Sequence, residues 1–321
     1  MMDVTTGFYT QDIWTWWLAL YLYLGGLGAA TLTTTFLTDM YIKPHRELVL
    51  WGTWSGIIML CLGSAMLFLH LLDHVAVIHV LNPMVLINQP NAWIAWGTQF
   101  IVWMMVWGFL YALPYMMDSP FFGRIPIVKN ILGWRLVQKI GRTCGRHCRL
   151  CGWLATINGI GTVVYTGLVL QSFPAVALWH NPGVPLLFTV SAFSTAMAFL
   201  LLVLGLAIKK HEEDRALCRF YERTDLMLIA AELVILFSFF FYLQGGSQSA
   251  AVSAQLLWKD WGWLIGFIGF GLLVPFFIEL KGVTKGWNSP SPIMLASVLV
   301  LVGGYLLRHY FLYAGVYARP W

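Results

Sequence analysis

The segment Gly303-Gly304-Tyr305-Leu306-Leu307-Arg308 places a glycine pair and an arginine inside an otherwise apolar stretch, residues 291–313. A stretch of this length is sufficient to cross a membrane, because about 20 apolar residues in a helix span the hydrocarbon core of a bilayer. A guanidinium at that depth is costly unless it faces protein, water or a counter-charge. We therefore expect a helical bundle in which Arg308 faces the interior.

Composition extends this expectation to the whole chain. Of its 321 residues 59% are hydrophobic and only 10% are charged, whereas a soluble domain carries about 25% charged residues. Eight apolar stretches are long enough to span a bilayer, at about residues 16–38, 49–72, 94–116, 152–173, 184–208, 223–244, 261–281 and 291–313. The sequence predicts an all-α, polytopic membrane protein with eight transmembrane helices.

Basic residues predict the orientation. Sixteen of the 19 Lys and Arg lie in the connections after the first, third, fifth and seventh stretches, and only Lys259, Arg308 and Arg319 lie elsewhere. Because cytoplasmic loops of membrane proteins are enriched in Lys and Arg, these four connections are expected in the cytoplasm and both termini outside. The net charge of +5 then reflects topology, and no nucleic-acid partner is expected.

One long connection divides the chain. Residues 117–151 contain Pro120, Pro126 and a basic run, and residues 125–140 have apolar side chains at helical spacing, as in a helix lying on the inner membrane surface. We expect helices 1–3 in residues 1–116, this interfacial segment in 117–151 and helix 4 in 152–173. Helices 5–8 and an outer C-terminal tail then occupy 174–321, so the spans form two groups of four.

Ionisable residues within the apolar stretches indicate a proton route. Asp225 and Glu232 are seven residues apart and share one helical face, Glu279 ends the seventh stretch, and Arg308 lies in the eighth. Such residues usually face a bundle interior and mark ion or proton pathways. A purely structural ion pair between Glu232 and Arg308 is the alternative, and Asp225 and Glu279 can also be hydrated near the inner boundary.

Histidines and cysteines give weaker indications. His70 and His309 are the only plausible pair of axial ligands for a haem between helices, and we expect no haem. Cys144, Cys148 and Cys151 form a C-x3-C-x2-C pattern in a basic loop, where a small metal site with His147 is conceivable but coincidence is the better interpretation. We expect no metal site.

Three motifs resemble the NrfD-like family, which includes the membrane subunit of polysulfide reductase. They are Tyr21–Ala30, with an aromatic-Leu-Gly-Gly opening; Pro174–Pro182 followed by Pro185–Ala192; and Gly303–Arg308, continuing to Ala314-Gly315. The resemblance implies an inner-membrane protein of a prokaryote that exchanges electrons between a quinone (menaquinone or ubiquinone) and a docked subunit. That partner is a four-cluster, ferredoxin-like iron–sulfur subunit, which connects to a molybdopterin catalytic subunit.

The resemblance also suggests where the quinone lies. His70, Asp73 and His74 share a helical face at the outer end of the second span, where an imidazole beside a carboxylate can exchange protons, although solvation at the interface explains them as well. Trp17 and Tyr21 are one turn apart in the first span, where relatives place an Asn and a His and this chain has Leu18 and Tyr21. Tyr165 in the fourth span is the expected partner across the bundle.

These features predict a membrane anchor that binds quinone or quinol on the outer side of the first four helices, with His70 and Asp73 moving its protons. The outer connections near 73–93, 174–183 and 244–260, with the C-terminal tail, are the expected docking surface for the iron–sulfur subunit. Two other functions stay open: a haem-bearing cytochrome b-type subunit, and a proton- or ion-translocating module without a quinone site.

Overall fold

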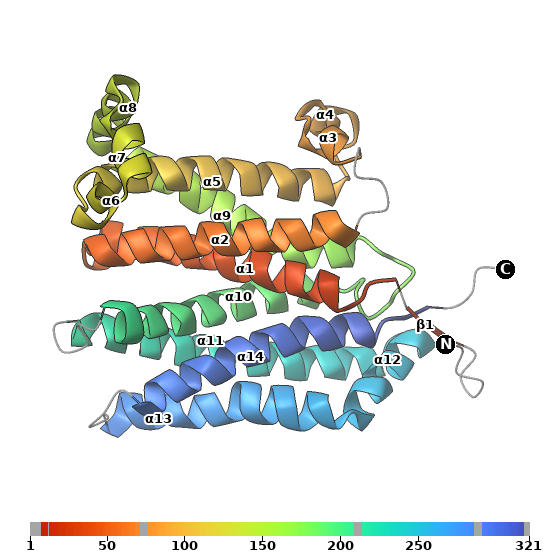
Figure 1. Ribbon diagram of the computed structural model, residues 1–321. Coiled ribbons are helices and arrows are strands. Elements are labelled where there is room, and N and C mark those ends of the chain that lie inside the picture. The colour runs from red at the N-terminus through yellow and green to blue at the C-terminus, as the bar shows by residue number, and fades with distance from the viewer. Residues whose placement is uncertain (1–7, 12, 71–75, 209–213, 286–290, 318–321) are drawn as a thin grey trace.

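The computed structural model describes residues 8–11, 13–70, 76–208, 214–285 and 291–317, and within them eight helices are long and apolar enough to cross a membrane. This confirms the eight predicted spans (Figure 1). They are α1 (Trp16–Leu37) with the π-helical η1 (Thr38–Ile42), α2 (Arg46–His70), α5 (Trp93–Met117), α9 (Cys148–Gln171), α10 (Gly183–Leu202) with η2 (Val203–Ile208), α11 (Arg215–Gln244), η3 (Gly262–Leu273) with α13 (Val274–Lys285), and α14 (Ser291–Tyr313).

Short elements connect the spans. They are β1 (Tyr9–Thr10), α3 (Ala76–Leu81), α4 (Met84–Asn88), α6 (Pro120–Arg124), α7 (Pro126–Gly133), α8 (Arg135–Arg146), α12 (Gln248–Lys259) and β2 (Val316–Tyr317). The single surface helix expected over residues 125–140 is instead broken into α7 and α8, with α6 before them. Ile125 and Trp134 have extended backbones at the two breaks, and Pro126 has no N–H for a continuing helix but fits the first position of a new one.

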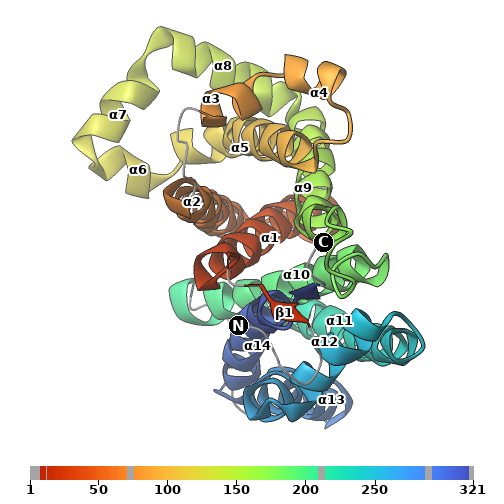
Figure 2. The same ribbon diagram turned by 90° about the vertical axis from the view of Figure 1, so that its right-hand side faces the viewer.

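The spans form two groups, as predicted. Helices α1, α2, α5 and α9 make the first, and α10, α11, η3–α13 and α14 make the second (Figures 1 and 2). The groups meet where α1 packs against α10 and α14 and where α9 packs against α10. Helix α1 therefore lies in the middle of the bundle. Of the most apolar part of its span 78% is buried, compared with 28% for α2.

Glycine permits close contacts between helices. A Cβ added at Gly303 would lie 2.7 Å from the Cα of Gly271, and one at Gly28 would lie 2.8 Å from the carbonyl oxygen of Gly56. At these positions backbone touches backbone, which only residues without a side chain allow. The contacts join α14 to η3 within the second group and α1 to α2 within the first.

Both described chain ends lie at one end of the bundle. Strands β1 and β2 pair antiparallel, with Tyr9 opposite Tyr317, and the Gln11 amide donates to the Leu312 carbonyl at 2.8 Å. We name this end, with α3, α4, α12 and residues 172–182, the terminal face. The opposite end, with α6–α8, residues 38–45 and the start of α11, is the basic face (Figure 1).

Candidate functional site

Arg308 is completely buried on α14 and is held by α10. Its Nη1 donates to Ser191 Oγ at 2.9 Å and to the Gly304 carbonyl at 2.7 Å, and Nη2 donates to the Phe188 carbonyl at 3.1 Å. Nε has no hydrogen-bonding partner in the described protein. Neutral acceptors thus orient the guanidinium, and none of these bonds neutralises its charge.

Glycines of the first and third sequence motifs meet around this guanidinium. A Cβ added at Gly26 on α1 would lie 3.7 Å from Arg308 Nη2, and one at Gly304 would lie 3.5 Å from Nη1. The rings of Phe188 and Tyr23 lie 5.1 and 5.9 Å from Arg308 Cζ, within the range of cation–π attraction. Arg308 therefore lies where α1, α10 and α14 converge, between the two groups.

Three buried carboxyl groups form what we name the acidic row: Asp225 and Glu232 on α11 and Glu279 on α13. Glu232 lies near Arg308 and within hydrogen-bonding reach of Ser191. Asp225 accepts a bond of 2.5 Å from Ser194, one turn along α10 from Ser191. Ser194 therefore contacts Asp225, and Ser191, one turn away on the same helix, contacts Arg308 and lies near Glu232.

The acidic row is poorly satisfied for buried carboxyl groups. Glu232 Oε1, Asp225 Oδ2 and both carboxyl oxygens of Glu279 lack a hydrogen-bonding partner in the described protein. Asp225 and Glu279 face each other within hydrogen-bonding reach, but two carboxylates only accept, so a bond between them requires a proton on one. Because an unpaired buried charge is very costly, this arrangement favours carboxyl groups that hold protons.

Tyr21 and Tyr165, which we name the tyrosine pair, meet in the first group near the terminal face. Their hydroxyl oxygens are 2.6 Å apart, and the side chains are only 4% and 2% exposed. A Cβ at Gly97 would lie 2.2 Å from the Tyr165 ring, so this glycine makes room for it. One hydroxyl hydrogen forms the bond within the pair, which leaves the second as a donor.

The tyrosine pair and Arg308 lie close to the same segment of α1. A Cβ at Gly26 would be 4.0 Å from the hydroxyl oxygen of Thr166, the residue after Tyr165. Tyr21 precedes Gly25 by four residues, or about one helical turn. The first motif of the sequence therefore connects the tyrosine pair to the buried arginine.

The remaining predicted quinone residues lie on the terminal face or outside the described residues. Trp17 is half-buried and its ring stacks on Trp16 with centroids 3.9 Å apart. His70 is half-buried at the last position of α2, while Asp73 and His74 lie outside the described residues, so their predicted cluster stays a prediction.

The two histidines of the alternative haem interpretation lie in different groups. His70 ends α2, whereas His309 lies on α14 and stacks against Tyr305 with centroids 5.9 Å apart. Cys144 and Cys151 are buried and Cys148 is half-buried near Tyr111. Among the described residues, no group of three or more His, Cys, Asp and Glu is arranged to hold a metal ion.

A second buried aspartate, Asp39 in η1, was missed in the sequence. It accepts hydrogen bonds from the hydroxyls of Tyr111 and Tyr115 at 2.6 and 2.5 Å, and from the backbone N–H of His45 at 2.9 Å. Three donors from two elements therefore satisfy its charge. The sequence signal was an acid four residues before the basic loop, together with two tyrosines spaced one turn apart in the third span.

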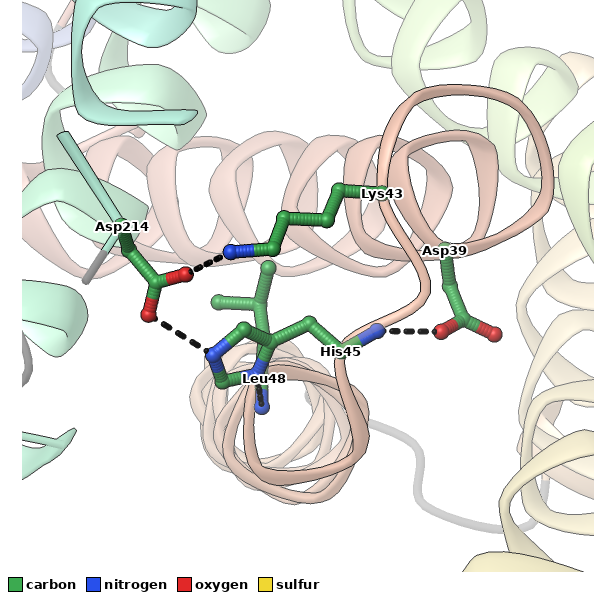
Figure 3. A network of polar contacts seen from close by, with 5 residues as sticks. All are labelled: Asp39, Lys43, His45, Leu48 and Asp214. Atoms are coloured by element: carbon green, nitrogen blue, oxygen red, sulfur yellow. Dashed lines mark hydrogen bonds and ion pairs between the residues drawn. The ribbon is translucent and has the colours of Figure 1, made fainter. Parts of the chain in front are cut away.

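His45 extends these contacts to the second group (Figure 3). The Leu48 N–H donates to His45 Nδ1 at 3.0 Å, so Nε2 carries the proton that is donated to Asp214 at 2.9 Å. Lys43 also pairs with Asp214. Burial favours a higher pKa for Asp214, but the hydrogen bonds from Lys43 and His45 outweigh it and lower that pKa.

The residues of these contacts form what we name the basic-face network: Asp39, Lys43, His45, Tyr111, Tyr115 and Asp214. The network ties η1, α2 and α5 of the first group to the start of α11 in the second. Every acid in it has a cation or several donors beside it. The network therefore stabilises the contact between the two groups at the basic face.

Comparison with known proteins identifies the family. The polysulphide reductase, NrfD family matches residues 5–318. The C subunit of polysulfide reductase from Wolinella succinogenes is 26% identical over 96% of this chain and 95% of its own length. Protein NrfD of Escherichia coli is 25% identical over 98% of both proteins, and the NrfD homolog of Haemophilus influenzae is 23% identical over the same shares.

The protein is thus a multi-pass membrane protein that belongs to the polysulphide reductase, NrfD family. This confirms the resemblance carried by the three sequence motifs.

Proposed function

We propose that this protein is the quinone-binding membrane subunit of a multi-subunit oxidoreductase, with the quinone ring held beside the tyrosine pair. The buried contact between Tyr21 and Tyr165 carries the proposal, because it leaves one phenolic hydrogen to donate to a quinone oxygen. A relative named as one subunit of polysulfide reductase supports a role within a larger complex. We place the basic face in the cytoplasm of a prokaryotic inner membrane.

The residues near the tyrosine pair match the needs of a quinone. A bound quinone supplies two-electron, two-proton redox chemistry, so its oxygens need donors and a route for protons. Tyr21 and Tyr165 hold the spare donor, and Gly97 makes room for the Tyr165 ring. Half-buried Trp17 contributes an aromatic surface at the same end of α1. His70 is our candidate for exchanging protons at the terminal face.

Electrons require a partner in this proposal. The terminal face carries apolar side chains suited to a protein contact, including Met84 and Ile87 of α4, which are 61% and 75% exposed, and Trp261, which is 74% exposed. We propose that an iron–sulfur subunit docks there and connects to a molybdopterin catalytic subunit. The clusters and molybdopterin then belong to the partners.

The matched pair Tyr21→Phe and Tyr221→Phe tests the quinone site. Both remove a buried hydroxyl, but Tyr221 bonds to Thr38 near the basic face at 2.8 Å, far from the tyrosine pair. In the intact complex, Tyr21→Phe is expected to raise KM for quinol about fivefold to tenfold, as one lost hydrogen bond implies, while Tyr221→Phe leaves it unchanged. Equal KM values for the two variants would contradict the proposal.

A second function, proton passage through the second group, is favoured by the acidic row. Glu232 lies 17 residues, or about 25 Å, along α11 from Arg215 at the basic face. Glu232, Asp225 and Glu279 each have at least one carboxyl oxygen without a hydrogen-bonding partner in the described protein. We propose that the acidic row passes protons between the basic face and the site at the tyrosine pair, with Arg308 as the fixed positive charge beside Glu232.

Glu232→Gln tests this route in proteoliposomes. The amide keeps the shape of the side chain but cannot release a proton, so quinol oxidation should persist while the protons moved per electron decrease. Ser253→Ala removes a buried hydroxyl that lies outside the row and serves as a control. An unchanged ratio of protons to electrons in Glu232→Gln would exclude this route.

A further inference from the structure

A large apolar cavity lies at the basic face, away from the tyrosine pair and the acidic row. It has a volume of about 1100 Å³ and opens between α2, α5 and the surface helices α6–α8. A typical small-molecule pocket has roughly 300–1,000 Å³. The end-on view shows α6, α7 and α8 projecting to one side of α2 and α5 (Figure 2).

The depth of the cavity matches one leaflet of a bilayer. Arg46 lines one end, and Trp54 and Ile58 continue along the same face of α2. Arg46 and Ile58 are 12 residues apart, which corresponds to about 18 Å along the helix. Half of a hydrocarbon core measures about 15 Å, so the cavity extends from the headgroup level to near the bilayer centre.

The surface helices that wall the cavity carry positive charge. Helices α7 and α8 turn Val128, Ile131 and Ile140 into the cavity. The segment from Pro120 to Arg146 contains six cations and no carboxylate: Arg124, Lys129, Arg135, Lys139, Arg142 and Arg146. All six are exposed. Among the described residues, Arg46 and Glu47 are the charged residues that line the cavity itself, and the six cations lie on the helices that wall it.

The cavity also offers a donor. Trp54 lines it, and its indole N–H is buried without a hydrogen-bonding partner in the described protein. An ester or phosphate oxygen is a suitable acceptor for such a group. The apolar walls accept hydrocarbon chains, and Arg46 together with the cations of α7 and α8 attracts a negative headgroup.

We propose that this cavity binds an anionic glycerophospholipid from the leaflet at the basic face, with its acyl chains between α2, α5 and α7–α8 and its headgroup among Arg46, Lys129 and Lys139. The lipid completes the contact between the surface helices and the first group. This inference does not depend on the proposed quinone site.

Native mass spectrometry of the delipidated, detergent-solubilised complex tests the proposal. The complex is titrated with an equal mixture of phosphatidylglycerol and phosphatidylcholine that have the same acyl chains. The first lipid retained is expected to be phosphatidylglycerol with at least fivefold preference. The combined variant Arg46→Gln, Lys129→Gln and Lys139→Gln should reduce that preference below twofold, because each cation near an anionic surface contributes about fivefold in affinity.

Two further variants separate charge from shape. Arg219→Gln, Arg223→Gln and Lys285→Gln remove three exposed cations from the second group and should leave the preference unchanged. Val128→Trp with Ile140→Trp narrows the cavity from the surface helices and should weaken retention of the first lipid whatever its headgroup.

Three results would overturn the proposal. They are equal retention of both lipids by the unmodified complex, an equal effect of the control variant, and displacement of the first lipid by an equimolar menaquinone. The measurement on the unmodified complex decides the matter even if a variant fails to fold.

Discussion

Asp39 and Glu232 are both buried carboxyl groups, but their surroundings differ. Asp39 accepts three hydrogen bonds and stands in the basic-face network. Glu232 has one carboxyl oxygen without a partner and belongs to a row of acids with more unpartnered oxygens. The comparison teaches that burial alone does not assign a role. A satisfied acid stabilises the fold as an anion, whereas an unsatisfied one is suited to bind and release a proton.

The largest expected effect is that of removing the satisfied acid, Asp39. Asp39→Ala leaves the hydroxyls of Tyr111 and Tyr115 and the N–H of His45 without their acceptor. We expect a loss of about 3–5 kcal/mol in the free energy of unfolding, as for the removal of one member of a buried charged network. Unfolding of the detergent-solubilised protein in a denaturant series measures it.

Glu232→Gln is the matched variant for this prediction. It keeps the volume of the side chain and, because the surroundings of Glu232 favour a carboxyl group that holds its proton, it changes the charge little, so its cost should stay below about 1 kcal/mol. Equal losses in Asp39→Ala and Glu232→Gln would show that the two acids do not differ as described.

The next largest effect is expected for Arg308, the buried cation between the two groups of helices. Arg308→Ala removes three donated bonds and the cation nearest to Glu232. We expect a loss of about 2–4 kcal/mol in the free energy of unfolding and at least a tenfold decrease in quinol turnover. Because Glu232→Gln removes the carboxyl group that has lost its neighbouring cation in Arg308→Ala, the double variant should recover about 1 kcal/mol. Strictly additive losses would show that the two residues do not interact.

A variant without any polar change separates packing from charge. Gly303→Ala places a Cβ 2.7 Å from the Cα of Gly271, where backbone cannot yield easily. We expect a loss of about 1–3 kcal/mol, as for overpacking of a core. Gly266→Ala on the same helix pair is the control, since its nearest neighbour, Leu306 Cδ1, would lie at 3.4 Å. Thermal unfolding of both variants makes the comparison, and a Gly303→Ala variant as stable as the control would contradict the close packing of α14 on η3.

The smallest effect is a dependence on pH. The pKa of Asp214 is lowered in the folded state by Lys43 and His45. Its contribution is therefore complete above the unfolded pKa of about 3.9 and is lost as the pH falls through the lower folded pKa. Asp214→Asn should be less stable than the unmodified protein at pH 6, and the difference should shrink toward pH 3. A difference that is constant over this range would contradict the role of the Asp214 charge.

Sequence reasoning captured the spans because length and hydropathy determine them. It also identified the residues that meet at the interior, since Arg308 and Glu232 are conspicuous in apolar segments. It missed Asp39, because an acid at the end of a span resembles a hydrated residue until the fold brings Tyr111 and Tyr115 to it. It also missed the break at Trp134, where helical periodicity continues although the backbone is extended.

Binding of a fluorescent quinol-site inhibitor to the purified complex tests the central claim most directly. Saturable quenching is expected at about one site per complex, with affinity decreased about tenfold when Tyr21→Phe and Tyr165→Phe are combined, and unchanged in Tyr221→Phe. Quenching that does not saturate in an intact complex, or that is identical in all three proteins, would contradict a quinone site at the tyrosine pair.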